Sequence, residues 1–503
     1  MGTNNTKQAF WVALGNFFTF SFGIVSAMVL SRYFDKTEYG TYKQVFYIYN
    51  ILLGVFTLGL PNAYSYFLAR SPIDQTKNLI WKMTRLFMAL GLCMSIVLLL
   101  GAGLISDTMK NPDLKEMLVV FAPVPFLLLP TLGLQNILVT FRRSNIIPFY
   151  VIITSVVQFT CVVLPVIIWH LGCKEALIGF NIGALISFGF AMYLNTFPVR
   201  HEADNKTQDT YRAIFKFAFP LFVASIWGTL INSTDQFFIS RYFGTEVFAD
   251  FSNGATDLPF VGMVIGATSA VLTPLFSRSV KEGEDFCKTI LPIWNNAFAK
   301  SAMLIYPIAI FCFFDAEEIM TVLYGDNYID STDYFRIKLL TYFFKVIAFY
   351  SLIIALGASR FYQSVHFYEF IGLAVSEIVV VKLFNNPLYI TAVHVLFTAG
   401  ACLVLIFYIS RQFKVKFLSM FPISILMKTL LSAILICVAI KFAEPLYIDL
   451  LNSSIIKLTI DFGVFMVLYY LISYLLHGIN LAMNRIFRFI ANFVFRIKIT
   501  YHI

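Results

Sequence analysis

Long apolar segments separated by short polar ones run along the whole chain. Each segment is about 20 residues long, the length that an α-helix needs to cross the hydrocarbon core of a bilayer, and is apolar on all faces of such a helix. The strands of a transmembrane β-barrel would instead alternate in polarity over roughly ten residues. The pattern predicts an all-α polytopic membrane protein.

The charged breaks between these segments predict about 14 transmembrane helices. We place the spans at residues 9–31, 45–68, 83–105, 117–141, 146–169, 176–197, 217–240, 253–277, 295–314, 339–357, 366–384, 388–409, 422–442 and 455–476. The spans at 295–314 and 366–384 are the weakest, because Lys300 and Glu369 interrupt them. An even number of spans places both termini on the same side of the membrane.

Composition removes the alternative of a soluble protein with one anchor. The 503 residues are 59% apolar and 13% charged, with a mean hydropathy of +0.78. Soluble domains are about a quarter charged, so this chain has too little charge to cover a surface in water.

The net charge of +9 reflects membrane orientation rather than a nucleic-acid partner. Lys and Arg lie between the apolar segments, with roughly two on the side of the N-terminus for each one on the other side. Cytoplasmic loops carry such an excess, so we expect both termini in the cytoplasm. The longest loop on the opposite side, residues 315–338, is acidic.

No pattern of catalytic or metal-binding residues is found. The seven cysteines form no C-x-x-C pair and the six histidines no metal-ligand spacing. A phosphate-binding loop, a dinucleotide-type glycine fingerprint and a nucleophile elbow are also missing from the sequence. We therefore predict a protein that is not an enzyme and has no cofactor or metal.

A short internal repeat indicates duplication. Ser31-Arg32-Tyr33-Phe34 ends the first span and Ser240-Arg241-Tyr242-Phe243 ends the seventh. We expect two six-helix bundles related by pseudo-two-fold symmetry, at residues 1–200 and 201–415. Two additional transmembrane helices (416–478) and a basic amphipathic cytoplasmic tail (479–503) complete the predicted organisation.

The residues around the first copy carry a resemblance to a known family. The run Ser-Arg-Tyr-Phe-Asp-Lys-Thr-Glu-Tyr-Gly-Thr-Tyr at 31–42, followed by Leu-Gly-Leu-Pro-Asn-Ala at 58–63, resembles the start of the polysaccharide-transport (Wzx-like) flippases. These belong to the multidrug/oligosaccharidyl-lipid/polysaccharide exporter superfamily. The extra pair of spans resembles its fourteen-span peptidoglycan-precursor branch.

The resemblance implies a flippase in the bacterial inner membrane. Its cargo would be an undecaprenyl-diphosphate-linked oligosaccharide repeat unit, moved from the cytoplasmic to the periplasmic leaflet for O-antigen, capsule or exopolysaccharide synthesis. Membrane lipids, a polysaccharide polymerase and a chain-length regulator are the partners implied. Two rival functions remain at this point: a cation-coupled multidrug antiporter of the same superfamily, and a membrane glycan polymerase or ligase.

A flippase needs cations for the diphosphate and polar groups for the sugar inside a hydrated cavity. Each basic candidate could instead be an interfacial anchor with its charged end in water, and each amide could join helices. The substrate-binding candidates are Arg32, Arg70, Arg241, Arg278, Lys300, Asn50, Asn232 and Gln236.

Ionisable groups inside spans are candidates for ion coupling, because burying a charge in the membrane is expensive. Asp235 in the seventh span and Asp257 in the eighth could exchange a proton, bind sodium or form structural ion pairs. Lys345 and Glu377 lie at similar depth in adjacent spans, which predicts a structural ion pair.

Small residues and prolines complete the predictions. The pairs Gly179/Gly183 and Gly262/Gly266 permit close approach of helices. Prolines such as Pro61 and Pro220 can kink the spans that contain them.

Overall fold

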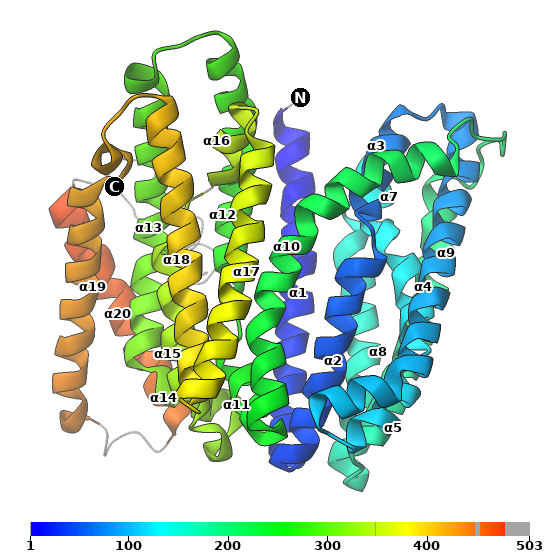
Figure 1. Ribbon diagram of the computed structural model, residues 1–503, viewed down its shortest axis with the longest axis horizontal. Helices are drawn as coiled ribbons and strands as arrows, with labels where there is room; N and C mark the ends of the chain where they lie inside the picture. The colour runs from blue at the N-terminus through cyan, green and yellow to red at the C-terminus, as the bar shows by residue number, and fades with distance from the viewer. Residues whose placement is uncertain (1, 348, 448–452, 478–503) are drawn as a thin grey trace, which may run out of the picture. The chain divides into compact units, whose positions relative to one another are not determined.

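The computed structural model describes residues 2–347, 349–447 and 453–477, which form helices and turns without a β-strand (Figure 1). This confirms the predicted all-α class. The predicted tail at 479–503 lies outside the described residues.

The helices follow one another along the chain with short connections. In order they are α1 (Gly2–Tyr33), α2 (Lys36–Phe56), α3 (Leu60–Arg70), α4 (Ile73–Met109), α5 (Asp113–Phe121), α6 (Val124–Leu128), α7 (Leu134–Thr140), α8 (Ile146–Trp169), α9 (Cys173–Thr196), α10 (Tyr211–Phe243), α11 (Thr245–Gly254), α12 (Pro259–Lys281), α13 (Leu291–Phe314), α14 (Ala316–Tyr324), α15 (Ser331–Leu339), α16 (Phe349–Ala355), α17 (Ser359–Leu383), α18 (Pro387–Gln412), α19 (Ile423–Ala443) and α20 (Ser454–His477).

Thirteen of the predicted spans correspond to helical segments that could cross a membrane. Within the described residues, eleven helices are individually long and apolar enough, and two bent helix pairs raise the number to 13. The two weakest predicted spans, which contain Lys300 and Glu369, are the continuous helices α13 and α17. The described part of 339–357 instead forms the short 3₁₀ turn Leu340–Phe343 and α16, which has only 7 residues.

The contacts divide the chain into two compact units. Unit 1 comprises Met1–Met263, Leu323–Thr341 and Gly357–Leu405, and unit 2 comprises Val264–Val322, Tyr342–Leu356 and Ile406–Ile503. The predicted bundle boundaries near residues 200 and 415 stay predictions.

The two bent spans of unit 1 meet at their bends. The α2–α3 pair bends by 43° and α10 bends by 44° after Val223. Gly59, between α2 and α3, has a φ of 69°, in the left-handed region that glycine tolerates best. A Cβ atom there would lie 2.8 Å from the carbonyl oxygen of Ala218 and 2.9 Å from the nitrogen of Phe222, both in α10. The break in one span therefore packs directly on the bend of the other.

Only one of the two predicted glycine pairs brings helices together. A Cβ atom at Gly179 in α9 would collide with the backbone carbonyl group of Cys161 in α8, and one at Gly183 would collide with Gln158. At Gly262 and Gly266 in α12, an added Cβ would meet no described atom within 4 Å. The Gly179/Gly183 pair therefore allows the close packing of α8 on α9.

A charged cluster in unit 2 connects the last two helices to α13 and α14. Lys441 of α19 lies 2.8 Å from Asp315 and 3.0 Å from Glu318. Lys457 of α20 lies 2.9 Å from Glu318 and also pairs with Glu444. Glu318 thus accepts hydrogen bonds from both lysines and links α14 to α19 and α20.

We predict that Gly179→Ala lowers the thermal midpoint of the purified protein in detergent, because α8 must move away from the new methyl group. Gly262→Ala is the matched control, since alanine favours a helix over glycine by up to about 1 kcal/mol and meets no neighbour there. Equal midpoint changes in the two variants would contradict the proposed contact.

Glu318 gives a prediction about pH. Burial raises the pKa of its carboxyl group, but hydrogen bonds from Lys457 and Lys441 outweigh burial and lower the pKa to about 2, from an ordinary 4.5. A depressed pKa in the folded state contributes stability above the unfolded pKa, which is lost as the pH falls toward the folded pKa. Glu318→Gln should therefore lower the thermal midpoint at pH 7, and the difference from the wild type should shrink below about pH 4.5.

The control is Glu317→Gln, because Glu317 is the exposed neighbour of Glu318 on α14. Its midpoint should match that of the wild type throughout. A Glu318→Gln deficit that stays constant down to pH 3 (about 1.5 units below the ordinary carboxyl value) would rule out the proposed linkage.

Candidate functional site

Arg32, the first predicted substrate-binding residue, lies at the C-terminal end of α1 and caps another helix. Its guanidinium group donates to the carbonyl oxygen of Leu323 and to that of Met28, at 2.7 Å each. The Ser31 hydroxyl donates to the carbonyl oxygen of Tyr324 at 3.1 Å. Leu323 and Tyr324 end α14, so the motif supplies donors to helix carbonyls that lack partners in their own helix.

The second copy of the motif caps the C-terminal end of α4. Arg241, near the end of α10, donates to the carbonyl oxygen of Asp107 at 3.1 Å and to that of Thr108. Ser240 accepts a hydrogen bond of 2.8 Å from Gln44 of α2. Each copy of the sequence motif therefore caps a helix encoded in the opposite half of the chain.

The other predicted basic candidates lie apart from these two. Arg70 stacks on the ring of Tyr66, with its guanidinium carbon 4.0 Å from the ring centroid. Arg278 pairs with Glu282 at 2.8 Å on an exposed part of α12, and Lys300 is exposed on α13.

The three polar candidates lie on α2 and α10. Asn50 of α2 and Asn232 of α10 are exposed, whereas Gln236 is half-buried and donates to the carbonyl oxygen of Asn232. Substrate binding by the eight candidates stays a prediction.

Asp235 lies in a buried cluster of ionisable side chains in unit 1. Its Oδ2 atom is 3.4 Å from Nδ1 of His394 and 4.0 Å from Nζ of Lys338. Glu377 belongs to the same electrostatic cluster through Asp235 and Lys338. The cluster is assembled from α10, α15, α17 and α18, and the exposed fraction of the Asp235, His394 and Glu377 residues is 1% or less.

The charges of this cluster depend on how many protons it holds. Lys338 supplies one positive charge, whereas Asp235 and Glu377 are two acids. Neither carboxyl oxygen of Glu377 accepts a hydrogen bond from a described residue. His394, next to Asp235, can gain or lose a proton, so the charge of the cluster can change with the protonation of this histidine.

The other two predictions about acidic residues concern Asp257 and the pair Lys345 and Glu377. Asp257 lies in the connection before α12, where it is exposed, and not inside the helix. Glu377 belongs to unit 1 and Lys345 to unit 2. Their predicted ion pair stays a prediction.

Sequence reasoning missed three further ionisable residues. His394 interrupts the apolar run of the twelfth predicted span, which is a signal that could have been used. Lys338 precedes a predicted span boundary by one residue and gives no such signal. Lys43 of α2 was passed over as part of the polar run that precedes the second span.

Lys36 and Asp250 form an ion pair that also escaped sequence reasoning. Their Nζ and Oδ2 atoms are 2.7 Å apart and join α2 to α11. Burial raises the pKa of the Asp250 carboxyl group to about 6, although the neighbouring Lys36 opposes this increase.

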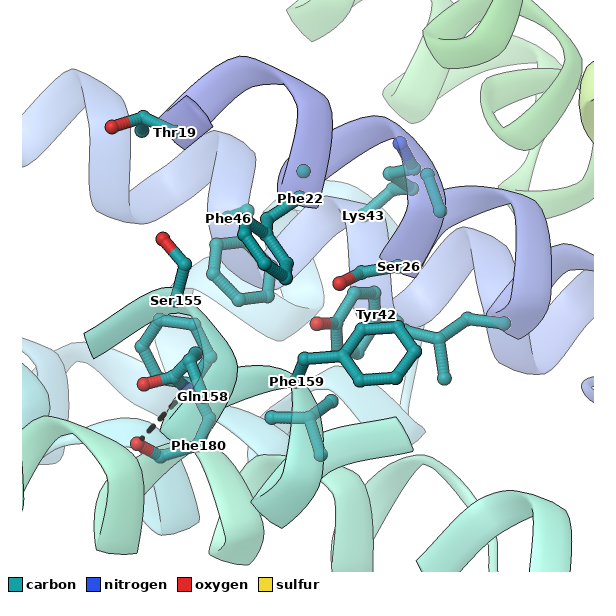
Figure 2. A pocket seen from close by; sticks show the side chains of 14 residues that line it. Thr19, Phe22, Ser26, Tyr42, Lys43, Phe46, Ser155, Gln158, Phe159 and Phe180 are labelled. Atoms are coloured by element: carbon teal, nitrogen blue, oxygen red, sulfur yellow. Dashed lines mark hydrogen bonds between the residues drawn. The ribbon is translucent and has the colours of Figure 1, made fainter. Parts of the chain in front are cut away.

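A cavity of about 390 Å³ lies in unit 1 among α1, α2, α8 and α9 (Figure 2). Rings from all four helices surround it, including those of Phe22, Phe46, Phe159 and Phe180. Lys43 is its one charged lining residue, and no carboxyl group lines it. The cavity thus combines an apolar wall with a single cation.

Solved structures of membrane transporters share this fold. The lipid II flippase MurJ in an inward closed conformation superposes with a TM-score of 0.72 at 13% identity, covering 93% of this chain and 98% of that chain. An inward-facing multidrug resistance MATE family transporter of the MOP superfamily gives 0.60 at 13% identity, covering 78% and 94%. The Vibrio cholerae MATE transporter VcmN, D35N mutant, gives 0.56 at 14% identity, covering 82% and 97%.

The shared fold and the apolar helices therefore define a multi-pass membrane protein with the fold of these transporters. Residues 6–280, more than half of the chain, match the model of the polysaccharide biosynthesis protein family. The chain belongs to this family. A search of the curated proteins found no match.

Proposed function

We propose that this protein is a flippase for an undecaprenyl-diphosphate-linked oligosaccharide repeat unit in the bacterial inner membrane. It would carry the head group from the cytoplasmic to the periplasmic leaflet by alternating access, for O-antigen, capsule or exopolysaccharide synthesis. The observation that carries this proposal is membership of the polysaccharide biosynthesis family, joined to a fold shared over 93% of the chain with a lipid II flippase.

The charge pattern supports a flippase over the rival antiporter. Cationic drugs require acidic pockets, whereas the cavity among α1, α2, α8 and α9 has a lysine and no acid in its lining. A glycan polymerase or ligase is less favoured, because the solved structures that share this fold are those of transport proteins.

We further propose that the buried cluster of Asp235, Lys338, Glu377 and His394 couples transport to protons. Asp235 and Glu377 are two buried acids in one cluster with Lys338 and His394, and a buried carboxylate is stable as a charge only beside a positive charge. Histidine gains and loses a proton within the physiological pH range and can supply that charge. Exchange of this proton between the two sides of the membrane would bias the alternation between inward-open and outward-open states.

The first test is depletion of the protein from cells, followed by analysis of lipid-linked saccharides. We expect an undecaprenyl-diphosphate-linked repeat unit to accumulate on the cytoplasmic side, inaccessible to a membrane-impermeant probe. Complementation by a chain with Arg32→Ala, Arg70→Ala, Arg241→Ala, Arg278→Ala and Lys300→Ala should fail, whereas the exposed Lys428→Ala control on α19 should restore export.

Two outcomes would separately contradict the flippase function and the binding role of the five basic residues. A normal pool exposed on the periplasmic side would argue against the flippase. Full export by the five-fold variant would refute only the cationic binding role of those residues.

The second prediction concerns the coupling ion. Asp235→Asn should abolish the dependence of flipping on a proton gradient in proteoliposomes, because it removes an acid from the buried cluster. Asp257→Asn should leave this dependence intact, since Asp257 is exposed before α12. Dependence on a sodium gradient in the wild type, or an unchanged proton dependence in Asp235→Asn, would overturn proton coupling by this cluster.

A further inference from the structure

The cavity among α1, α2, α8 and α9 contains an unpaired cation. Lys43 is half-buried, and no carboxylate in the described parts of the chain lies within ion-pairing distance of its ammonium group. Its nearest cation–π partner is Tyr39, whose ring centroid lies 5.2 Å from Nζ. Removing an ammonium group from water without a counter-charge is costly, so an anion in the cavity would offset this cost.

Hydroxyl groups lie in the same wall. Ser26, Tyr42 and Ser155 come from α1, α2 and α8, and among the described residues none of their hydroxyls hydrogen-bonds to another group. Figure 2 shows these three side chains and that of Lys43 among the residues that line the cavity. One ammonium and three hydroxyl donors provide the kind of contacts that phosphate oxygens accept.

The remaining wall is apolar and aromatic. Phe22, Phe46, Phe159 and Phe180 line the cavity, and Gly23 leaves space on the side of α1. The volume of about 390 Å³ is near the lower end of small-molecule pockets. It suits a small head group and part of an apolar chain, and is too small for an oligosaccharide.

We propose that this cavity binds the phosphate group of an anionic lipid, with Lys43, Ser26, Tyr42 and Ser155 around the phosphate and the lipid chain along the phenylalanine rings. The assignment of the chain as a polyprenyl chain rests on the proposed flippase function. The assignment of a phosphate ligand does not rest on that function, because it follows from the three hydroxyl donors and the unpaired charge of Lys43. The cavity would hold the lipid carrier at its phosphate while the sugar lies elsewhere.

The test is equilibrium binding of radiolabelled undecaprenyl phosphate to the purified full chain in nanodiscs. We expect saturable binding at least tenfold tighter than that of uncharged undecaprenol, which is the size of effect that one charge-assisted contact produces. Comparable affinity for undecaprenol would overturn the proposal, as would inorganic phosphate binding as tightly as the lipid, since that would indicate a site for soluble anions.

Four variants distinguish loss of lipid binding in the cavity from a general effect of substitution on the protein. Lys43→Met should weaken binding about tenfold or more, and Lys43→Arg should retain it, because the charge is kept. Gly23→Leu should fill the cavity and block binding, while leucine also favours the helix over glycine. Gly189→Leu is its control, because this exposed glycine of α9 also has no neighbour within 4 Å and does not line the cavity.

Wild-type affinity in Lys43→Met or in Gly23→Leu would refute the site. The outcome of this binding measurement is independent of the depletion experiment that tests the proposed function. A protein whose depletion traps the saccharide lipid, but which does not distinguish undecaprenyl phosphate from undecaprenol, would remain a flippase without this site. A protein that binds undecaprenyl phosphate through Lys43, but whose depletion leaves the pool normal, would keep the site and lose the proposed function.

Discussion

The reciprocal capping of helix ends by Arg32 and Arg241 is the interaction on which the organisation of unit 1 depends. The last carbonyl groups of a helix have no partner within it, and a membrane protein has few other donors to offer them. Here the end of α14 receives donors from α1, and the end of α4 receives them from α10. Because the exchange is mutual, neither half of the chain can complete its helices without the other, and α2 lies beside α11 with Lys36 bound to Asp250.

The same need to satisfy polar groups explains how the buried charges of the two units are arranged. Glu318 in unit 2 has two lysine partners and serves to join helices. Asp235 and Glu377 lie in one cluster with Lys338, and His394 is next to Asp235. The first arrangement pairs a carboxylate with two lysines, whereas the second includes a histidine, whose charge changes within the physiological pH range.

Hydropathy alone predicted most of the fold, because a span in lipid must be apolar over its full length. At 339–357 the composition is equally apolar, but the described backbone forms the 3₁₀ turn Leu340–Phe343 and α16 in place of one continuous helix. The burial of Asp235 was predictable from its place in an apolar run. Its partner Lys338 was not, because it lies 103 residues away in the sequence, a separation that only the folded chain removes. The roles of Arg32 and Arg241 also needed the structure, since the sequence repeat shows equivalence but not which carbonyl groups are bound.

The meeting of the α2–α3 break with the bend of α10 has a kinetic consequence. At Gly59 the chain is already outside the regular helix, in a conformation that glycine adopts at little cost. A rotation of α3 about this point would break the turn hydrogen bond from the Leu60 N–H to the Thr57 carbonyl oxygen. This bond and the repacking of Gly59 against Ala218 and Phe222 would therefore set the activation barrier of the rotation. Evolution could then adjust the speed of such a movement through the side chains around one glycine, without altering any group that holds a charge.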